Sequence, residues 1–588
     1  MLRRFCFLSC VLAFITPAYS GVTLEIHHLW EGKPLALPSQ ELTTRSGEKI
    51  DLTRLSYLLS DPRLLRRGDN EASGNWISRK NWFAFVEGTT GVAASSLGDL
   101  PAANYTTLQF HIGLDPQYDQ ADPNQYPASH PLNPVLNNLH WTPQGGYIFL
   151  ALEGHLRNQD NDGFTYHLGN SWNRMTITLP AALTFKRNAT VVIDFHLDRL
   201  FNTAPALKIA GQPSTHSRKD DAMAATLKSR IERAFTFRTL RQDQPSISPP
   251  KSKPTRELIG TPYKFRVARG FPIPKLPTDF PLTDERVTLG ESLFHDPLLS
   301  RNNTQSCSSC HQKAHALSDA TQFSQGNSGS LGTRNTMPLF NLAWKESFFW
   351  DGRAPSIRKQ AVQPIQNPVE MHESLPHVIE ELKAASYPDR FKESFGTAEI
   401  TEERIGIALE QYLLTQTSYD SKFDRAASGV GRLSESEKRG FELFMTEFDP
   451  RRGLKGADCF HCHGGALFTD QRFHNNGLKD EKDLGLGAIT KKSSDRNRFI
   501  TPSLRNIALS APYMHDGRFQ SLDQVIDHYD SGLHRSPTLD PNLAKHPRGG
   551  LGLSKEDKAA LLAFLKTLTD PQFRDGETTG PQATEEEP

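Results

Sequence analysis

Six residues form two short motifs that can do chemistry. They are Cys307, Cys310 and His311 in "CSSCH", and Cys459, Cys462 and His463 in "CFHCH". In a C-x-x-C-H motif the two thiols can form thioethers with the vinyl groups of a haem, while the histidine ligates its iron. The two motifs therefore predict two covalent c-type haems.

Zinc binding and dithiol redox chemistry are the competing interpretations. A zinc site would need both C-x-x-C pairs, which lie far apart in the sequence, to converge on one ion. It would also leave the histidine that follows each pair unexplained, as would a thioredoxin-like dithiol. Haem attachment explains all six residues, and it leaves His461, inside the second motif, as a bystander.

The other two of the six cysteines, Cys6 and Cys10, lie in a segment with the pattern of a signal peptide. "MLRR" is followed by the apolar run "FCFLSCVLAFI" and by small residues at Ala18 and Ser20. We expect cleavage after residue 20 and export to the periplasm, where unpaired thiols usually become disulfides. A lipoprotein anchor at Cys10 is the alternative, although the apolar run continues past it.

The composition excludes several classes of partner. The 588-residue chain has a formal net charge of zero, so no bulk attraction to nucleic acid or to an anionic membrane is indicated. After the signal peptide no apolar run approaches the length of a membrane span. We expect a soluble mature protein with several domains.

The sequence pattern changes in the middle of the chain. "TTLQFHIGL" and "VVIDFHLD" alternate apolar and polar residues, which is typical of strands in an antiparallel sandwich. After a Pro/Ser-rich segment the pattern becomes helical, as in "SESEKRGFELFM", where Ser434 and Glu437 can form a capping box. The predicted fold is an N-terminal all-β sandwich followed by two mainly α cytochrome c-type haem domains. The predicted segments are 1–20 (signal peptide), 21–240 (sandwich), 241–262 (linker), 263–428 (first haem domain), 429–573 (second haem domain) and 574–588 (disordered acidic tail).

The C-terminal half contains a duplication. "NLAWKESFFWDGR" and "NIALSAPYMHDGR" align without a gap, so that Trp350 corresponds to His515. The same offset sets Pro364 against Tyr529. A proline cannot ligate iron, whereas a tyrosine phenolate can. The halves therefore predict one haem with an open distal side and one that is capped.

These motifs, with "GTRNTMPLFN", "FFWDGRAPS" and "NPVEM", resemble those of the bacterial di-haem cytochrome c peroxidase family, which includes MauG, over about Pro262 to Phe573. The resemblance implies that the haem on His311 reacts with hydrogen peroxide and that Trp350 relays electrons between the haems. It maps Glu370 onto the distal acid/base, a role that peroxide cleavage requires.

The same resemblance implies further site residues. Gln360 and Pro364 would line the peroxide pocket with Glu370. A calcium ion between the domains would be held by Asn335, Ser510 and Pro512.

Three positions depart from the peroxidase pattern. Asn327 replaces the histidine that many family members place on the first haem, which predicts a permanently open site. Tyr529 stands where peroxidases place a methionine, as in MauG, with Met514 as the rival sixth ligand. Anionic oxygen ligation favours oxidised iron, which suits storing oxidising equivalents. Ala457 replaces a tryptophan that MauG uses to pass oxidation outward, so the exit route is open to question.

Residues 22–240 resemble the MbnP family of copper-associated periplasmic proteins through "GEKIDLTRLSYLLSD", "NNLHWTPQGGYIFLALEG" and "FTYHLG". MbnP is commonly paired with MbnH, a MauG relative that oxidises an MbnP tryptophan to kynurenine beside a copper site. The resemblance makes Trp141 the first candidate substrate, followed by Trp82 and Trp172. The candidate copper ligands are His28, His167 and His216, with His111 and His196 on polar strand faces; imidazole suits copper.

The sequence therefore predicts a periplasmic di-haem oxidoreductase that uses hydrogen peroxide to form a high-valent di-haem state. That state would oxidise a protein tryptophan, most simply in the enzyme's own N-terminal domain. The first alternative is a hydrogen peroxide reductase fed by a small electron-donor cytochrome or cupredoxin. The second alternative is a copper-binding or electron-transfer protein whose haems only relay electrons.

Overall fold

The structure is a computed structural model. It describes residues 19–68, 76–141, 146–186, 188–215, 217–242, 259–268, 270–450 and 453–574. The expectations for the signal peptide up to residue 18, for the linker over 243–258, for the tail over 575–588 and for His216 fall outside the described residues.

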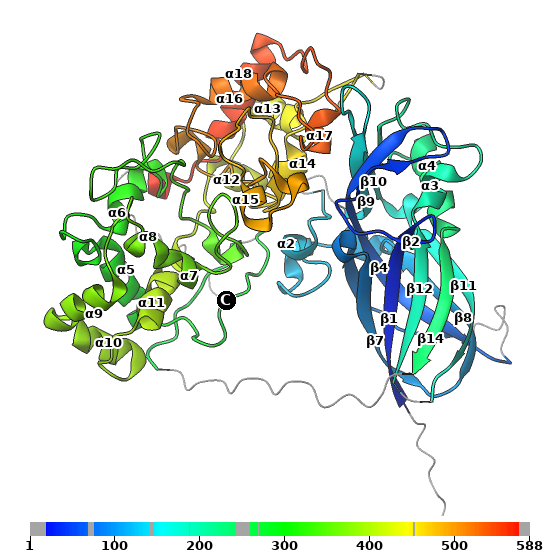
Figure 1. The fold of residues 1–588 in the computed structure, drawn as a ribbon, viewed down its shortest axis with the longest axis horizontal. Coiled ribbons are helices and arrows are strands. Elements are labelled where there is room, and N and C mark those ends of the chain that lie inside the picture. Colours follow the sequence, from blue (N-terminus) through cyan, green and yellow to red (C-terminus); the bar gives the residue numbers. More distant parts are fainter. Residues whose placement is uncertain are drawn as a thin grey trace, which may run out of the picture.

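Three bodies are visible in Figure 1. The β-sandwich lies at one side, the first haem domain at the other, and the second haem domain lies between them.

Among the described residues the sandwich has a five-stranded and a nine-stranded sheet. The first sheet has the order β14-β12-β1-β2, with β7 also pairing β1; the second has the order β11-β8-β4-β9-β10-β13, with β3, β5 and β6 pairing β4. The strands of the first are β1 (Tyr19–Trp30), β2 (Lys33–Pro34), β7 (Val92–Pro101), β12 (Ala189–His196) and β14 (Phe235–Gln242). Those of the second are β3 (Leu42–Thr43), β4 (Lys49–Arg66), β5 (Trp76–Ser78), β6 (Phe83–Glu87), β8 (Asn104–Ile112), β9 (Ile148–Leu156), β10 (Gly163–Gly169), β11 (Met175–Thr184) and β13 (Ser214–Thr215).

The predicted strands are present and most of them pair antiparallel, but two pairs depart from the expected antiparallel arrangement. β8 buries Leu108, Phe110 and Ile112, as the alternation predicted. β1, however, runs parallel to β12, and β10 runs parallel to β13. Parallel pairing suits strands that are distant in sequence, because such strands need no tight hairpin. The domain also contains the helix α4 (Ala222–Glu232), capped by Asp221.

The C-terminal half is mainly helical, as predicted. The helices before the second motif are α5 (Asp284–His295), α6 (Cys307–Cys310), α7 (Ile357–Ala361), α8 (Gln363–Gln366), α9 (Leu375–Ala384), α10 (Tyr387–Phe395), α11 (Glu402–Thr415), α12 (Lys422–Ala427) and α13 (Glu435–Met445). Those that follow are α14 (Phe460–His463), α15 (Leu486–Thr490), α16 (Leu522–Ser531), α17 (Pro541–Ala544) and α18 (Lys555–Lys566). The capping box of Ser434 and Glu437 opens α13.

The duplication is visible in the packing of two helix pairs. α5 packs on α11, and α13 packs on α18. In each pair a glycine allows the backbones to touch: a Cβ on Gly290 would lie 2.8 Å from the Cβ of Tyr412, and one on Gly440 would lie 2.8 Å from the Cβ of Phe564. Gly290 begins "GESLF" before the first haem motif, and Gly440 begins the similar "GFELF" before the second. This similarity is therefore a packing requirement as well as a sequence pattern.

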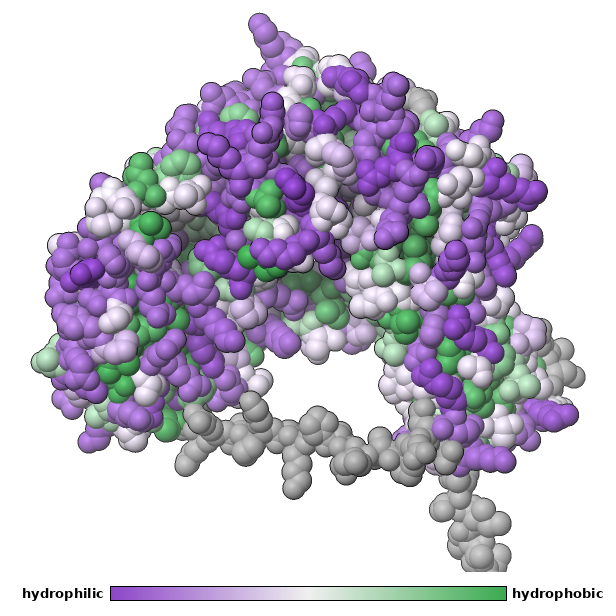
Figure 2. All heavy atoms as spheres, viewed as in Figure 1, coloured by the Kyte–Doolittle hydropathy of each residue, from purple (hydrophilic) through white to green (hydrophobic). Residues whose placement is uncertain are grey.

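Polar side chains cover most of the face of the molecule shown in Figure 2, with small, separate hydrophobic areas. In the part of the chain that the structure describes, no helix combines the length and apolar character needed to cross a bilayer.

Candidate haem sites and the interface between domains

A cavity of about 870 Å³ adjoins the first C-x-x-C-H motif. Its lining includes Cys307, Cys310, His311, Trp350, Gln360, Pro364 and Glu370. The structure therefore gathers, around one cavity, every residue that the sequence assigned to the peroxide-reacting haem.

The two motif histidines have the same orientation. His311 Nδ1 lies 2.9 Å from the carbonyl oxygen of Leu317, and His463 Nδ1 lies 3.2 Å from that of Phe468. Iron-ligating histidines usually donate this second ring N–H to a carbonyl or carboxylate, which fixes the tautomer and leaves Nε2 for the metal. Both motifs thus fit haem ligation.

The thiols do not fit dithiol redox chemistry. The four cysteines of the described chain form no disulfide. Burial raises the pKa of Cys307 and of Cys459 to about 12. Redox-active dithiols have lowered thiol pKa values, so the interpretation as haem attachment is the one the geometry supports.

Glu370 lies in the first cavity with its carboxyl group held in place. Asn367 Nδ2 donates to Glu370 Oε1 at 2.6 Å. Burial raises the pKa of Glu370, while Asn367 and Arg353 act in the opposite direction. The N–H of Asn327 donates to the backbone oxygen of Glu370 at 2.7 Å, so the loop expected to lack a haem ligand packs against this residue.

The second cavity, of about 200 Å³, is lined mostly by apolar side chains and by the second motif. Its lining also includes the two rival ligands and the three predicted calcium-binding residues: Tyr529, Met514, Asn335, Ser510 and Pro512. The calcium ligands are thereby brought to one region, and calcium binding itself stays a prediction.

Tyr529 and Met514 both lie near Asn476. Asn476 Nδ2 is 3.5 Å from Met514 Sδ, and the same side chain hydrogen-bonds Tyr529. Met514 has a left-handed φ of 76°, and its duplicate Phe349 has one of 65°. The left-handed backbone at Met514 is therefore shared by both halves of the duplication, whereas a tyrosine at the position of Tyr529 occurs only in the second half.

Trp350 lines both haem cavities. Its indole Nε1 donates to the backbone oxygen of Asn335 at 2.8 Å, and the N–H of Asn335 donates to the backbone oxygen of His515 at 2.8 Å. The two residues that correspond in the duplication, Trp350 and His515, are thus linked through one asparagine.

Two features of the haem sites were not predicted. Arg334 joins the haem domains, with Nη1 2.7 Å from Asp351 in the first and Nε 2.6 Å from Asp483 in the second. Lys345 lines the first cavity, and burial lowers its pKa to about 8. Both lie in motifs quoted above, "GTRNTMPLFN" and "NLAWKESFFWDGR", but neither residue was assigned a role there.

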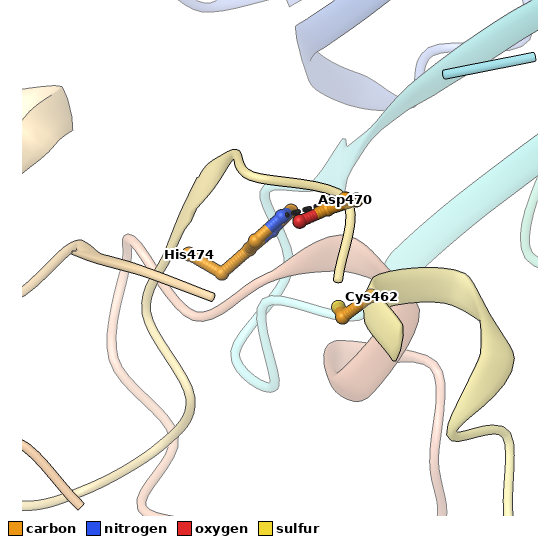
Figure 3. A group of neighbouring side chains, drawn as sticks. All are labelled: Cys462, Asp470 and His474. Atoms are coloured by element: carbon orange, nitrogen blue, oxygen red, sulfur yellow. Dashed lines mark hydrogen bonds and ion pairs between the residues drawn. The ribbon is translucent and has the colours of Figure 1, made fainter. Parts of the chain in front are cut away.

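Cys462, Asp470 and His474 form a compact group beside the second motif (Figure 3). Among the described residues, one ligand-type atom from each lies within 4.8 Å of the others. Cys462 belongs to the haem motif, so we interpret the group as an ion cluster. Burial lowers the pKa of His474, but Asp470 and Asp540, with oxygens 2.7 and 2.5 Å away, outweigh it and raise the value to about 10.

The β9–β10 hairpin of the sandwich docks onto the second haem domain. His155 Nε2 lies 2.6 Å from the backbone oxygen of Leu539, and Arg535 Nη1 lies 3.2 Å from Asp162. Gly163 lies directly against Pro541 of α17. The sandwich therefore makes specific contacts with the second haem domain.

A third cavity, of about 70 Å³, lies at this interface. Trp141 and His167 line it from the sandwich, and His461 and the segment from Gly464 to Leu467 line it from the second haem domain. The ring centres of His167 and His461 are 5.4 Å apart, and His461 Nε2 is 3.2 Å from Asp458. His461, expected to be a bystander, is part of the domain interface.

The other tryptophans do not line this cavity. Trp82 Nε1 donates to the backbone oxygen of Ser96 at 2.7 Å. Trp172 is 44% exposed, and its Nε1 donates to the backbone oxygen of Ser217 at 2.9 Å. Of the three candidates, only Trp141 is placed next to a haem-motif segment by the described residues.

The predicted copper ligands have other partners. His28 Nε2 lies 2.9 Å from the Tyr57 hydroxyl inside the sandwich, and His167 Nε2 lies 3.0 Å from Glu153 at the interface. Within the described ranges neither belongs to a group of three metal-ligating side chains. A copper site at His28, His167 and His216 stays a prediction.

Two haem-attachment motifs on a duplicated helical fold define a di-haem peroxidase-type oxidoreductase, and the comparisons agree. Residues 284–431 match the family model of di-haem cytochrome c peroxidase, and residues 19–217 match that of MbnP. The chain belongs to the di-haem cytochrome c peroxidase family that includes MauG, and carries an MbnP domain before it.

Two relatives and one solved structure illustrate the relationship. The chain is 38% identical to methylamine utilization protein MauG of Methylorubrum extorquens over 53% of this chain and 85% of that protein. It is 31% identical to cytochrome c551 peroxidase of Pseudomonas aeruginosa over 54% of this chain and 89% of that protein. A MauG-like protein associated with microbial copper homeostasis matches with 33% identity and a TM-score of 0.48, over 53% of this chain and 97% of that one.

Proposed function

We propose that this enzyme uses hydrogen peroxide to oxidise Trp141 of its own sandwich domain, in the periplasm. The main support for this proposal is the interface cavity, which is lined by Trp141, His461 and Gly464. His461 and Gly464 both lie within two residues of His463. No further chain is needed to bring this tryptophan to the second haem site. When bound, the haems supply the redox chemistry that draws on peroxide.

The side chains of the first cavity have distinct proposed roles. Glu370 moves a proton between the two oxygens of the bound peroxide, and Asn367 holds its carboxyl group in position. Gln360 and Pro364 shape the pocket, and the absence of a histidine at Asn327 leaves the distal side accessible.

The second cavity is proposed to work differently. Tyr529 would hold the iron of a haem bound here, with Met514 as the rival, and a phenolate oxygen would favour the oxidised state. Trp350, which lines both cavities, relays electrons between the sites. The missing exit tryptophan at Ala457 is explained if the substrate tryptophan itself lies at the second haem domain.

A mixing experiment tests whether the reaction is intramolecular. Haem-loaded Glu370→Gln protein, which keeps Trp141, is mixed with Trp141→Phe protein, which keeps Glu370, and peroxide is added. We expect wild-type protein to oxidise its own Trp141 at a rate independent of protein concentration, and the mixture to gain little oxidised Trp141. Efficient oxidation in the mixture, rising with concentration, would mean that the substrate is presented by another molecule.

A peroxide reductase fed by a small cytochrome is the second candidate, because relatives of 31% and 33% identity are named cytochrome c551 peroxidases. Steady peroxide consumption that depends on a reduced cytochrome, with Trp141 unchanged, would favour it.

A further inference from the structure

The interface cavity beside Trp141 has the size and polarity of a water site. Its volume of about 70 Å³ has room for about two water molecules. Glu153 and His167 of the sandwich and His461 and Asp470 of the second haem domain line it. Polar cavities of this size hold ordered water, whereas apolar cavities stay dry.

Fixed charges surround the cavity. Glu153 Oε1 lies 2.8 Å from Arg54 Nη1 and 3.0 Å from His167 Nε2. Glu153 is thereby paired with the guanidinium group of Arg54. An ionised carboxylate in the wall is a strong acceptor for the hydrogens of water.

The indole of Trp141 lines the same cavity. Its Nε1 is buried and has no hydrogen-bond partner among the residues that the structure describes. A Cβ on Gly169 would lie 2.7 Å from two carbons of the indole ring, so a glycine in β10 is what allows the ring to pack here. A buried donor without a partner is costly unless water satisfies it.

We propose that this cavity is a water-binding site and that its water supplies the oxygen atom inserted into Trp141. The inference rests on the proposed function. The water oxygen bonds to an indole carbon of Trp141, and the step releases two electrons and two protons. The same two electrons, with two protons, reduce one hydrogen peroxide to two water molecules, so the net reaction is tryptophan plus peroxide giving hydroxylated tryptophan plus water.

Asp470 lies between the water cavity and His474. Its carboxylate lines the water cavity, and its Oδ2 lies 2.7 Å from His474 Nε2. His474 in turn lines the second haem cavity. Asp470 and His474 therefore connect the place where protons are released with the haem site that receives the electrons.

Isotope labelling tests the source of oxygen. Haem-loaded full-length protein receives one equivalent of ordinary hydrogen peroxide under argon, in water enriched in the heavy oxygen isotope, and the Trp141 peptide is analysed by mass spectrometry. We expect the heavy isotope in the product, and no label when heavy peroxide is used in ordinary water. Label derived from peroxide would overturn the inference while leaving tryptophan oxidation intact, and an unmodified Trp141 would overturn both proposals.

A cavity-filling variant tests the site itself. Val135 lines the cavity from the sandwich, so Val135→Phe narrows it and Val135→Ala widens it. We expect Val135→Phe to lower the yield of oxidised Trp141 per peroxide consumed, because the remaining space no longer holds the water. Val135→Ala should keep the wild-type yield, and thermal unfolding verifies that both variants fold. An unchanged yield in Val135→Phe would overturn the water site.

Discussion

The interface between the sandwich and the second haem domain can be loosened by one methyl group. Gly163 opens β10 against Pro541 of α17. A Cβ at this position would lie 2.7 Å from the carbonyl carbon of Pro541 and 2.8 Å from its Cα, whereas ordinary contacts are 3.4–4 Å. Because both neighbours are backbone atoms that cannot rotate away, Gly163→Ala must push β10 and α17 apart.

The size of the effect follows from the contacts. Overpacking of this kind costs about 1–3 kcal/mol, which corresponds to a factor of about 5–150 in an equilibrium. The hydrogen bond from His155 to Leu539 contributes about 0.5–1.5 kcal/mol, and the partly exposed ion pair of Arg535 with Asp162 about 0.2–1 kcal/mol. The clash is therefore comparable with what these bonds contribute to docking.

We expect Gly163→Ala to slow oxidation of Trp141 by about 5–150-fold, while peroxide is still consumed at the first haem. Peptide mass spectrometry measures the first rate, absorbance measures the second, and small-angle X-ray scattering should show a larger radius of gyration. Gly211→Ala is the matched control, because the nearest atom to its added Cβ is 3.8 Å away. Oxidation of Trp141 at the wild-type rate in a demonstrably undocked Gly163→Ala protein would refute the docking requirement.

Three further changes test individual residues. Glu370→Gln should keep both haems but slow the reaction with peroxide by about 10²–10⁴-fold, the usual contribution of acid–base catalysis; unchanged stopped-flow kinetics would remove Glu370 from this role. Tyr529→Phe should change the absorption spectrum of the second haem, and an unchanged spectrum with a shifted Met514→Leu spectrum would assign the ligand to Met514. Lys545 Nζ lies 3.1 Å from the carboxylate of the buried Asp458. Lys545→Met removes this positive partner and should lower the unfolding free energy by about 3–5 kcal/mol in denaturant titrations. Stability within 1 kcal/mol of wild type would contradict the last estimate.

Much of the haem half could be predicted because its signals are local. The spacing in C-x-x-C-H fixes two thiols and a histidine on one helical turn, and the repeat around Asn341 and Asn506 appears as two left-handed residues with φ of 54° and 56°. The family resemblance added Glu370 and Gln360, which line the same cavity as His311.

The interface could not be predicted because its residues are distant in sequence. Trp141 and His461 are brought together only by the docking of two domains, and nothing in either motif indicates it. The parallel pairing of β1 with β12 also could not be predicted. An alternating pattern of apolar and polar residues indicates which side chains are buried, but not the direction of the partner strand. The His474 ion cluster was missed because Asp470 and Asp540 belong to no recognisable spacing.

Peptide mass spectrometry of the haem-loaded wild-type protein, before and after one equivalent of hydrogen peroxide, tests the central claim most directly. We expect oxygen addition at Trp141, with Trp82 and Trp172 in the same digest unchanged. Full consumption of the peroxide with all three tryptophans unmodified would contradict it.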